Sequence, residues 1–168
     1  MNAVIETPRL LLREFSVDDA GFMLRLVNEP SWLKYIGDRK VYTLADAERY
    51  LTEGSIKSYH DKGFGFWKVE LKSDGSAMAS AGLAKRDYLD DVDLGFAFLP
   101  EFTRQGYALE AAEAIVLYAK EKLGLTRLVA YTTQDNVSSI RLLMKLGFQF
   151  ESSLILENDE LNLYGKAL

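Results

Sequence analysis

A glycine-bearing turn at residues 100–108 is the segment whose residue types are best suited to chemistry. It reads Pro-Glu-Phe-Thr-Arg-Gln-Gly-Tyr-Ala and precedes a helical pattern. Glycine lets a backbone approach a ligand closely, and a helix N-terminus offers unpaired N–H groups and partial positive charge. The turn at Gly106 therefore predicts a binding site for an anionic group such as a pyrophosphate, with Arg104 and Gln105 as further donors. The alternative is an ordinary loop that enters a helix.

A second polar turn follows about one strand and one helix later, at residues 135–139 (Asp-Asn-Val-Ser-Ser). Asn136 and Ser139 are three residues apart at a helix start, so their side chains share a face. Residues of these types are also ordinary helix caps, and that alternative stays open. His60 is the only histidine and cysteine is absent. A histidine-based triad, a cysteine nucleophile and a metal site are therefore not predicted.

Composition predicts one domain over residues 1–168. The chain is 48% hydrophobic, which is enough for a sizeable core without disulfides. Its net charge of −5 disfavours nucleic-acid binding and mildly favours cationic partners. No apolar run approaches the roughly 18 residues of a membrane span, and no leader pattern opens the sequence. We expect a soluble cytoplasmic protein with no membrane partner.

The elements that must position these turns follow from hydrophobic periodicity and turn residues. Helices are predicted at residues 16–28, where Pro30 would end the helix, and at 43–62, 107–123 and 136–146. Strands are predicted at residues 10–14, 64–71, 77–86, 92–99, 128–133, 148–156 and 161–168, with turns at 73–76 and 157–160. The tally predicts an α+β fold: a mixed, mostly antiparallel sheet of about seven strands flanked by four helices.

Four segments in this order resemble the GNAT superfamily of acyl-CoA N-acetyltransferases, and within it the branch of ribosomal-protein N-terminal acetyltransferases. They are residues 7–13 (Thr-Pro-Arg-Leu-Leu-Leu-Arg), 92–96 (Val-Asp-Leu-Gly-Phe), 104–111 (Arg-Gln-Gly-Tyr-Ala-Leu-Glu-Ala), and 136–140 (Asn-Val-Ser-Ser-Ile) with 146–148 (Leu-Gly-Phe). Gly-x-Ala alone is a weak motif, whereas the spacing of all four segments is specific. The expected fold is therefore the GNAT fold with a central splay in its sheet.

The resemblance implies acetyl-CoA as cosubstrate, with its pyrophosphate on the turn at Gly106. Its pantetheine arm would lie where the parallel strands 92–99 and 128–133 diverge, and would pair with strand backbone as an added strand does. Gly95 would mark a bulge there; a regular strand with a small residue for packing is the alternative. Thr103 stands where the family has Gln or Arg, and Arg104 and Gln105 would compensate. The residues expected to bind the cosubstrate are Phe96, Ala97, Phe98, Arg104, Gln105, Gly106, Tyr107, Ala108, Asn136 and Ser139.

The resemblance also implies two catalytic candidates. Asp93 matches the acidic residue that the family often carries at this strand and would serve as the base, whereas a solvated acidic turn with its neighbours is the alternative. Ser139 would donate a proton to the departing thiolate. Leu143 stands where many family members have a tyrosine acid, so the tyrosine mechanism is not expected.

These expectations together predict an N-acetyltransferase that moves an acetyl group directly to a primary amine. The favoured acceptor is a protein or peptide N-terminal α-amine, whose pKa near 8 makes it easier to deprotonate than lysine. A small amine such as a polyamine, amino acid or aminoglycoside is the alternative. Two other classes remain open: a non-catalytic acyl-CoA-binding regulatory domain, and a module for another phosphate ligand. A homodimer is compatible with the sequence but not established by it.

Overall fold

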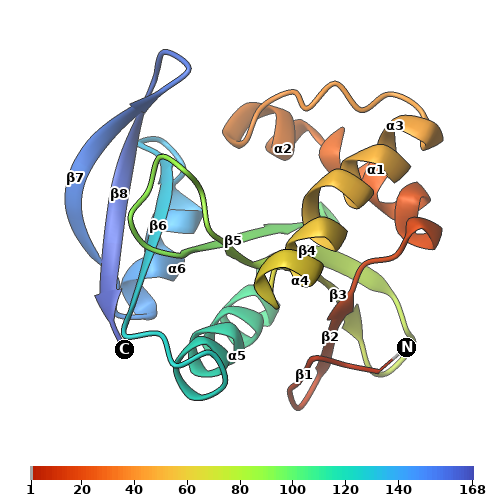
Figure 1. Ribbon diagram of the computed structural model, residues 1–168, viewed down its shortest axis with the longest axis horizontal. Helices are drawn as coiled ribbons and strands as arrows, with labels where there is room; N and C mark the ends of the chain where they lie inside the picture. The colour runs from red at the N-terminus through yellow and green to blue at the C-terminus, as the bar shows by residue number, and fades with distance from the viewer. Residues whose placement is uncertain (1) are drawn as a thin grey trace.

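The computed structural model describes residues 2–168, which form one eight-stranded sheet with helices on both sides (Figure 1). The strand order is β1-β2-β3-β4-β5-β6-β8-β7, and every neighbouring pair is antiparallel except β5 and β6. The strands are β1 Ile5–Glu6, β2 Leu10–Glu14, β3 Phe66–Leu71, β4 Ala77–Ala84, β5 Asp93–Phe98, β6 Arg127–Thr133, β7 Gln149–Leu156 and β8 Asp159–Ala167. The α+β prediction is confirmed. The strand count is one higher than expected because β1 is only two residues long, too short for a recognisable pattern.

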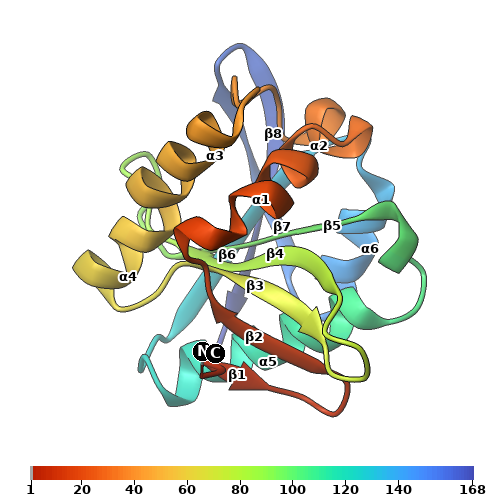
Figure 2. The same ribbon diagram turned by 90° about the vertical axis from the view of Figure 1, so that its right-hand side faces the viewer.

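The helices cover the two faces of the sheet as separate groups (Figure 2). They are α1 Ala20–Val27, α2 Pro30–Tyr35, α3 Leu44–Leu51, α4 Lys57–Lys62, α5 Tyr107–Glu121 and α6 Val137–Lys145. Apolar residues of α5 and α6 pack with the sheet in one buried cluster. A second buried cluster joins α1, α2 and α3 on the other face, and Phe15 and Trp32 belong to it. None of the helices in residues 2–168 is long and apolar enough to cross a membrane.

The prediction of four helices was wrong at two places. Pro30 does not end a helical region but begins α2, because a proline at the first helical position loses no hydrogen bond. The single helix expected at residues 43–62 begins with the predicted capping box of Thr43 and Asp46, and a π-helical stretch at Thr52–Ile56 then divides it into α3 and α4. A one-residue widening of a helix leaves the hydrophobic pattern nearly intact, so no sign of it is present in the sequence.

The last hairpin is tighter than expected. Glu157 and Asn158 alone connect β7 to β8, and both have positive φ, 48° and 71°. Two such residues form the kind of turn that matches the twist of a hairpin. The four-residue turn predicted at 157–160 is therefore corrected to two residues, and β8 begins at Asp159.

The predicted central splay is present between β5 and β6. These parallel strands pair only at Asp93 and Val129, next to a hydrogen bond of 3.0 Å from the Val129 N–H to the Val92 carbonyl. All six residues of β5 pair with β4 on the other side. Beyond Asp93, β5 and β6 therefore diverge, and the facing edge of β5 is left without a strand partner.

Gly95 is not a bulge, and that expectation was wrong. Its pairing with Gly82 sits within an unbroken register between β4 and β5. A Cβ atom on Gly95 would lie 2.8 Å from the Phe66 ring. Glycine is needed here because an aromatic side chain packs against the strand, which was the alternative reading of this residue.

Candidate functional site

The turn between β5 and α5 has the backbone geometry of an uncapped helix start. Arg104 and Gly106 both have positive φ, 61° and 82°, and Gly106 is the N-cap of α5. Glycine adopts this left-handed conformation without the steric cost that other residues incur. No side chain caps the helix. The first N–H groups of α5, including those of Tyr107 and Ala108, are therefore available to an external acceptor.

Arg9, near the N-terminus, makes several contacts with this turn. Its Nε donates to Glu110 Oε1 at 2.7 Å and its Nη1 to the Gln105 carbonyl at 3.1 Å. The guanidinium also lies 4.3 Å from the centre of the Tyr107 ring. Thr7 donates its hydroxyl to the same Glu110 carboxylate at 2.6 Å. Thr7 and Arg9 thus stabilise the turn. The Glu110 carboxylate binds these two residues instead of capping α5.

The two predicted side-chain donors of the turn are placed differently. Gln105 donates its amide Nε2 to the Glu101 carbonyl at 2.9 Å, so this donor is used within the turn. Arg104 is exposed, and its side chain makes no hydrogen bond or ion pair within residues 2–168. Of the two, Arg104 is the donor that remains free to meet an anion.

The diverging edge of β5 supplies backbone groups on the side of the gap. Alternate residues of a strand direct their N–H and C=O groups to the same edge. The Val92 carbonyl faces β6, and the Leu99 N–H bonds to Met78 O of β4. By this alternation the backbone groups of Phe96 and Phe98 face the gap, whereas those of Ala97 face β4. Two of the three predicted strand residues thus present unpaired groups to the splay.

Asn136 and Ser139 lie across the gap, at the start of α6 after β6. Asn136 is the N-cap, and its Oδ1 accepts a long hydrogen bond of 3.4 Å from the Ser139 N–H. The capping role is therefore real, and it leaves the Asn136 amide donor free. Ser139 as a whole residue is half-buried. Leu143, at the position of the family's tyrosine, is buried in the core.

Asp93 lies at the closed end of the splay and is only 2% exposed. Burial raises the pKa of its carboxyl group, and the charge of Arg86 partly opposes that rise. Arg86 Nε donates to Asp93 Oδ1 at 2.9 Å. The alternative of a solvated acidic turn is therefore wrong for Asp93.

Three neighbours of Asp93 were missed from the sequence. The Arg86 guanidinium lies 5.5 Å from the centre of the Tyr131 ring, and the hydroxyls of Tyr131 and Tyr88 are 2.9 Å apart. Burial raises the pKa of Tyr131, so its hydroxyl stays protonated. Arg86 and Tyr88 belong to the connection before β5, and Tyr131 belongs to β6. No local motif links them, although the alternation of β6 could have placed Tyr131 on the same face as Val129.

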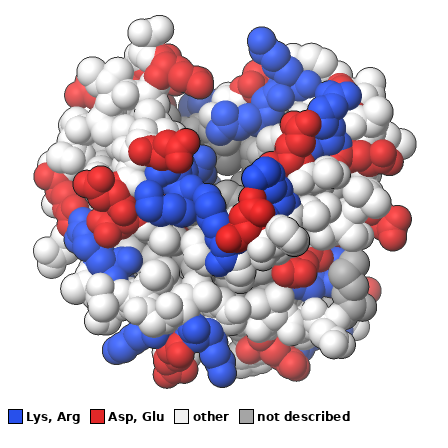
Figure 3. Space-filling view, in the orientation of Figure 1, with Lys and Arg blue, Asp and Glu red and all other residues white. Residues whose placement is uncertain are grey.

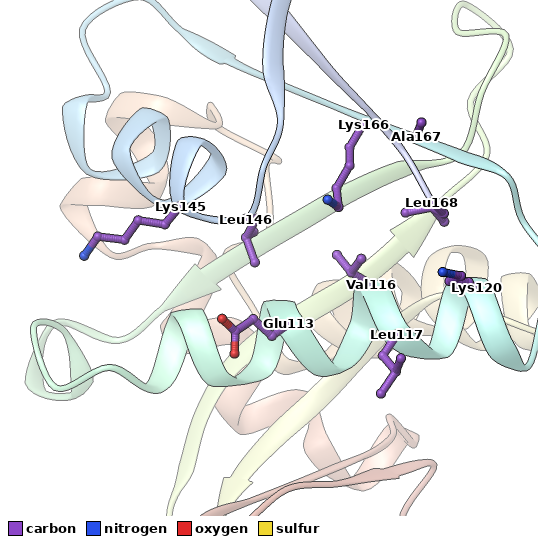
Figure 4. Close-up of a pocket in the computed structure, with 9 residues that line it drawn as sticks. All are labelled: Glu113, Val116, Leu117, Lys120, Lys145, Leu146, Lys166, Ala167 and Leu168. Atoms are coloured by element: carbon purple, nitrogen blue, oxygen red, sulfur yellow. The ribbon is translucent and has the colours of Figure 1, made fainter.

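A separate pocket of about 380 Å³ lies between α5, the end of α6 and the end of β8 (Figure 4). It contains none of the predicted site residues. Its lining residues are Glu113, Val116, Leu117, Lys120, Lys145, Leu146, Lys166, Ala167 and Leu168.

Comparison with known proteins finds N-acetyltransferases that are similar in sequence or in fold. The N-acetyltransferase YoaA of Bacillus subtilis is 28% identical over 155 residues, which cover 92% of this chain and 87% of that protein. The solved structure of RimL, a ribosomal L7/L12 α-N-protein acetyltransferase in complex with coenzyme A, superposes with a TM-score of 0.84 at 15% identity, covering 99% of this chain and 98% of that one. The ribosomal-protein-S5-alanine acetyltransferase of Vibrio fischeri gives a TM-score of 0.79 at 16% identity, covering 96% and 94%.

The family described as the acetyltransferase (GNAT) domain matches residues 9–149. This span includes Arg9, the splay between β5 and β6, the turn at Gly106 and the start of α6. With its eight-stranded GNAT fold and its named N-acetyltransferase relatives, this chain belongs to the GNAT acetyltransferase family and is an acyltransferase.

Proposed function

We propose that the protein transfers the acetyl group of acetyl-CoA directly to a primary amine. The observation that carries this proposal is the uncapped start of α5 at Gly106, which adjoins the end of β5 where the splay is open. Together these features match a ligand that has an anionic group and an extended arm with amides. A relative with the same fold, RimL, was solved in complex with coenzyme A.

The cosubstrate would run from the turn toward Asp93. Its pyrophosphate accepts hydrogen bonds from the N–H groups of Tyr107 and Ala108, with Arg104 nearby. Its pantetheine amides pair with the exposed backbone of Phe96 and Phe98. The free amide donor of Asn136 meets the same arm from the other side of the gap. The thioester then lies toward the narrow end of the splay, on the path to Asp93.

The chemistry requires a neutral amine, which attacks the thioester carbonyl carbon and forms a tetrahedral oxyanion. Backbone N–H groups of the β5 edge would stabilise that oxyanion. Asp93 would accept the proton that the amine loses, through one water because its carboxylate is buried. As the C–S bond breaks, Ser139 would donate a proton to the thiolate and regain one from solvent, while Asp93 releases its proton to solvent. The products are an acetylated amine and free coenzyme A.

The acceptor that we favour is a protein or peptide N-terminal α-amine, by analogy with the ribosomal-protein acetyltransferases that share this fold. A small-molecule amine is the alternative. A non-catalytic acyl-CoA-binding domain is the alternative from another class, and it would bind the cosubstrate without ever releasing thiol. We also propose a cytoplasmic location; a homodimer remains a proposal to test by solution mass.

Titration calorimetry with acetyl-CoA tests the cosubstrate. Gly106→Val should lose the binding that the wild type has. Gly124→Val is the matched control, because Gly124 lies just beyond the other end of α5 with a similar φ of 67° and nothing within 4 Å of an added Cβ. Both variants therefore carry a similar backbone strain, but only Gly106→Val alters the proposed pyrophosphate site and places a side chain against Arg9.

Acetyl-CoA binding by the wild type and the Gly124 variant, with loss in the Gly106 variant and none of ATP, would support the proposal. No binding by the wild type, or equal binding by both variants, would mean that the turn is structural. Release of free thiol on addition of amine acceptors then separates an enzyme from a binding domain.

A further inference from the structure

A hollow opens on the face of the sheet covered by α1, α2 and α3, between these helices and the hairpin of β7 and β8. Lys and Arg side chains lie along its rim on both sides, with Asp and Glu side chains among them (Figure 3). This face also carries Asp93 and Tyr131, because the neighbouring residues Leu94 and Ala130 point into the core on the opposite face. An amine acceptor that reaches the narrow end of the splay from this side meets Arg86, the arginine bonded to Asp93.

Arg86 is a cation at the narrow end of the splay, where it bonds to Asp93. Its Nε is bonded to Asp93, and its guanidinium lies over the Tyr131 ring. The two terminal nitrogens make no hydrogen bond within residues 2–168, although the side chain is only 28% exposed. A guanidinium fixed on one edge and free on the other is preorganised to bind a planar anion with two parallel hydrogen bonds.

Arg39 is a second cation whose charge acts on the same region of the protein as that of Arg86. Burial raises the pKa of the Tyr50 hydroxyl on α3, and the charges of both Arg39 and Arg86 oppose that rise. The charges of both guanidinium groups therefore reach the Tyr50 hydroxyl. Arg39 is exposed and forms no ion pair with any residue from 2 to 168. Of these two arginines only Arg86 forms an ion pair, with the buried Asp93.

This charge imbalance has a physical consequence. Two cations near one another repel, and a half-buried guanidinium with unused donors is incompletely solvated. A ligand carboxylate would remove both costs and would fix the ligand's orientation. A cationic ligand would add a third positive charge to the same place.

We propose that the acceptor amine carries a carboxylate close to the amino group, and that Arg86 and Arg39 bind this carboxylate. The inference rests on the proposed function and narrows it to the class of amino-carboxylates. Two sources offer this chemistry: a free amino acid, and a peptide whose N-terminal residue has an acidic side chain. The acceptor class is therefore the reverse of the cationic partner that net charge favours.

The test compares matched acceptors with and without the carboxylate, and kcat/KM is expressed per neutral amine because the carboxylate also raises the pKa of the amino group. One pair is alanine and alaninamide, and the other is a short amidated peptide beginning with Asp and the same peptide beginning with Asn. Binding to the coenzyme A-saturated protein is measured by calorimetry, and kcat/KM by thiol release. We expect the carboxylate member of at least one pair to be favoured by about tenfold or more. The pair that shows the preference identifies the source.

Variants then assign the preference to the two arginines. Arg39→Gln and Arg86→Gln should each reduce the carboxylate-to-amide ratio several-fold. Arg49→Gln is the matched control, since Arg49 precedes Tyr50 on α3 but is exposed and paired with Asp46. Arg86→Gln also removes the partner of Asp93 and should slow all acceptors, so the ratio is the decisive quantity. Arg39→Gln leaves that ion pair intact.

Several outcomes would overturn the inference. These are equal or better use of the amide acceptors, no binding or turnover of any carboxylate acceptor, or a ratio that the Arg39 and Arg86 variants leave unchanged. Failure of this inference alone would appear as acetyl-CoA binding with turnover of neutral or cationic amines. Failure of the proposed function would appear earlier, as absence of acetyl-CoA binding by the wild type.

Discussion

Replacement of Arg9 by lysine should weaken acetyl-CoA binding while leaving the fold almost as stable. Arg9 bonds to the Glu110 carboxylate and to the Gln105 carbonyl at once, and it stacks on Tyr107. Lysine can keep an ion pair with Glu110, but its single ammonium group cannot reproduce the planar fork or the stacking. The side chain is 44% exposed, so the lost ion-pair geometry should reduce unfolding free energy by only about 0.5 kcal/mol.

The effect on binding should be larger, because the bond to the Gln105 carbonyl fixes the residue next to Gly106. Loss of one partly exposed hydrogen bond to a charged group is worth about 1 kcal/mol, which raises Kd for acetyl-CoA roughly fivefold. Calorimetry measures Kd, and urea unfolding measures stability. The control is Arg25→Lys, since Arg25 is also exposed and pairs with Glu101, in the same connection before α5. An unchanged Kd in the Arg9 variant, or the same change in both, would refute the idea that Arg9 shapes the turn.

Three further predictions concern buried groups. Asp93→Asn should lower kcat and leave the Kd for acetyl-CoA nearly unchanged. Burial raises the pKa of Asp93, so the kcat of the wild type should increase as pH rises through that pKa. An identical pH profile of kcat in the variant would contradict a role of Asp93 as the base. Burial would raise the pKa of Asp19, but hydrogen bonds from Arg13 and Lys68 outweigh it and lower the pKa to about 2 from 3.8. Asp19 thus contributes about 2 kcal/mol of stability above pH 4, which is lost as pH falls from 4 toward 2, and urea unfolding of Asp19→Asn should show a flatter acid limb. Gly82→Ala should destabilise by about 2 kcal/mol or more in thermal unfolding because its Cβ would lie 2.2 Å from the Gly65 carbonyl oxygen, whereas Gly21→Ala in helix α1, with open space around it, should stabilise by about 0.5 kcal/mol; equal effects would refute the packing argument.

Much of the fold could be predicted because its elements are long enough to show a period. The strand patterns near residues 64–71 and 77–86 and the helix beginning at Tyr107 gave the main sheet and α5 within a few residues. The elements that were not predicted share a physical cause, because each involves too few residues to show a period. A two-residue strand, a proline that starts a helix and a π-helical stretch each change hydrogen bonds without changing the hydrophobic pattern.

Gly95 illustrates a different limit. A glycine within a strand has several possible causes, and the sequence does not distinguish a bulge from a close aromatic contact. The Phe66 ring that excludes a side chain at Gly95 comes from a strand almost thirty residues earlier, two strands away in the sheet. Only the register of β3, β4 and β5 brings the two together.

The candidate site has one part that local sequence could predict and one part that depends on the folded sheet. The part proposed for the cosubstrate consists mostly of backbone groups at a helix start and a strand edge, so Gly106 and Asn136 could be found from local sequence. The part proposed for the acceptor consists of side chains, and Arg39 and Arg86 come from two connections that only the folded sheet brings near Tyr50. If the members of this family share the proposed cosubstrate, the first part can stay local and recognisable while the second varies with each acceptor. The identity of the acceptor should therefore depend on the charged side chains around Asp93. The sequence predicted one carboxylate there, and the structure adds Arg86 and Arg39.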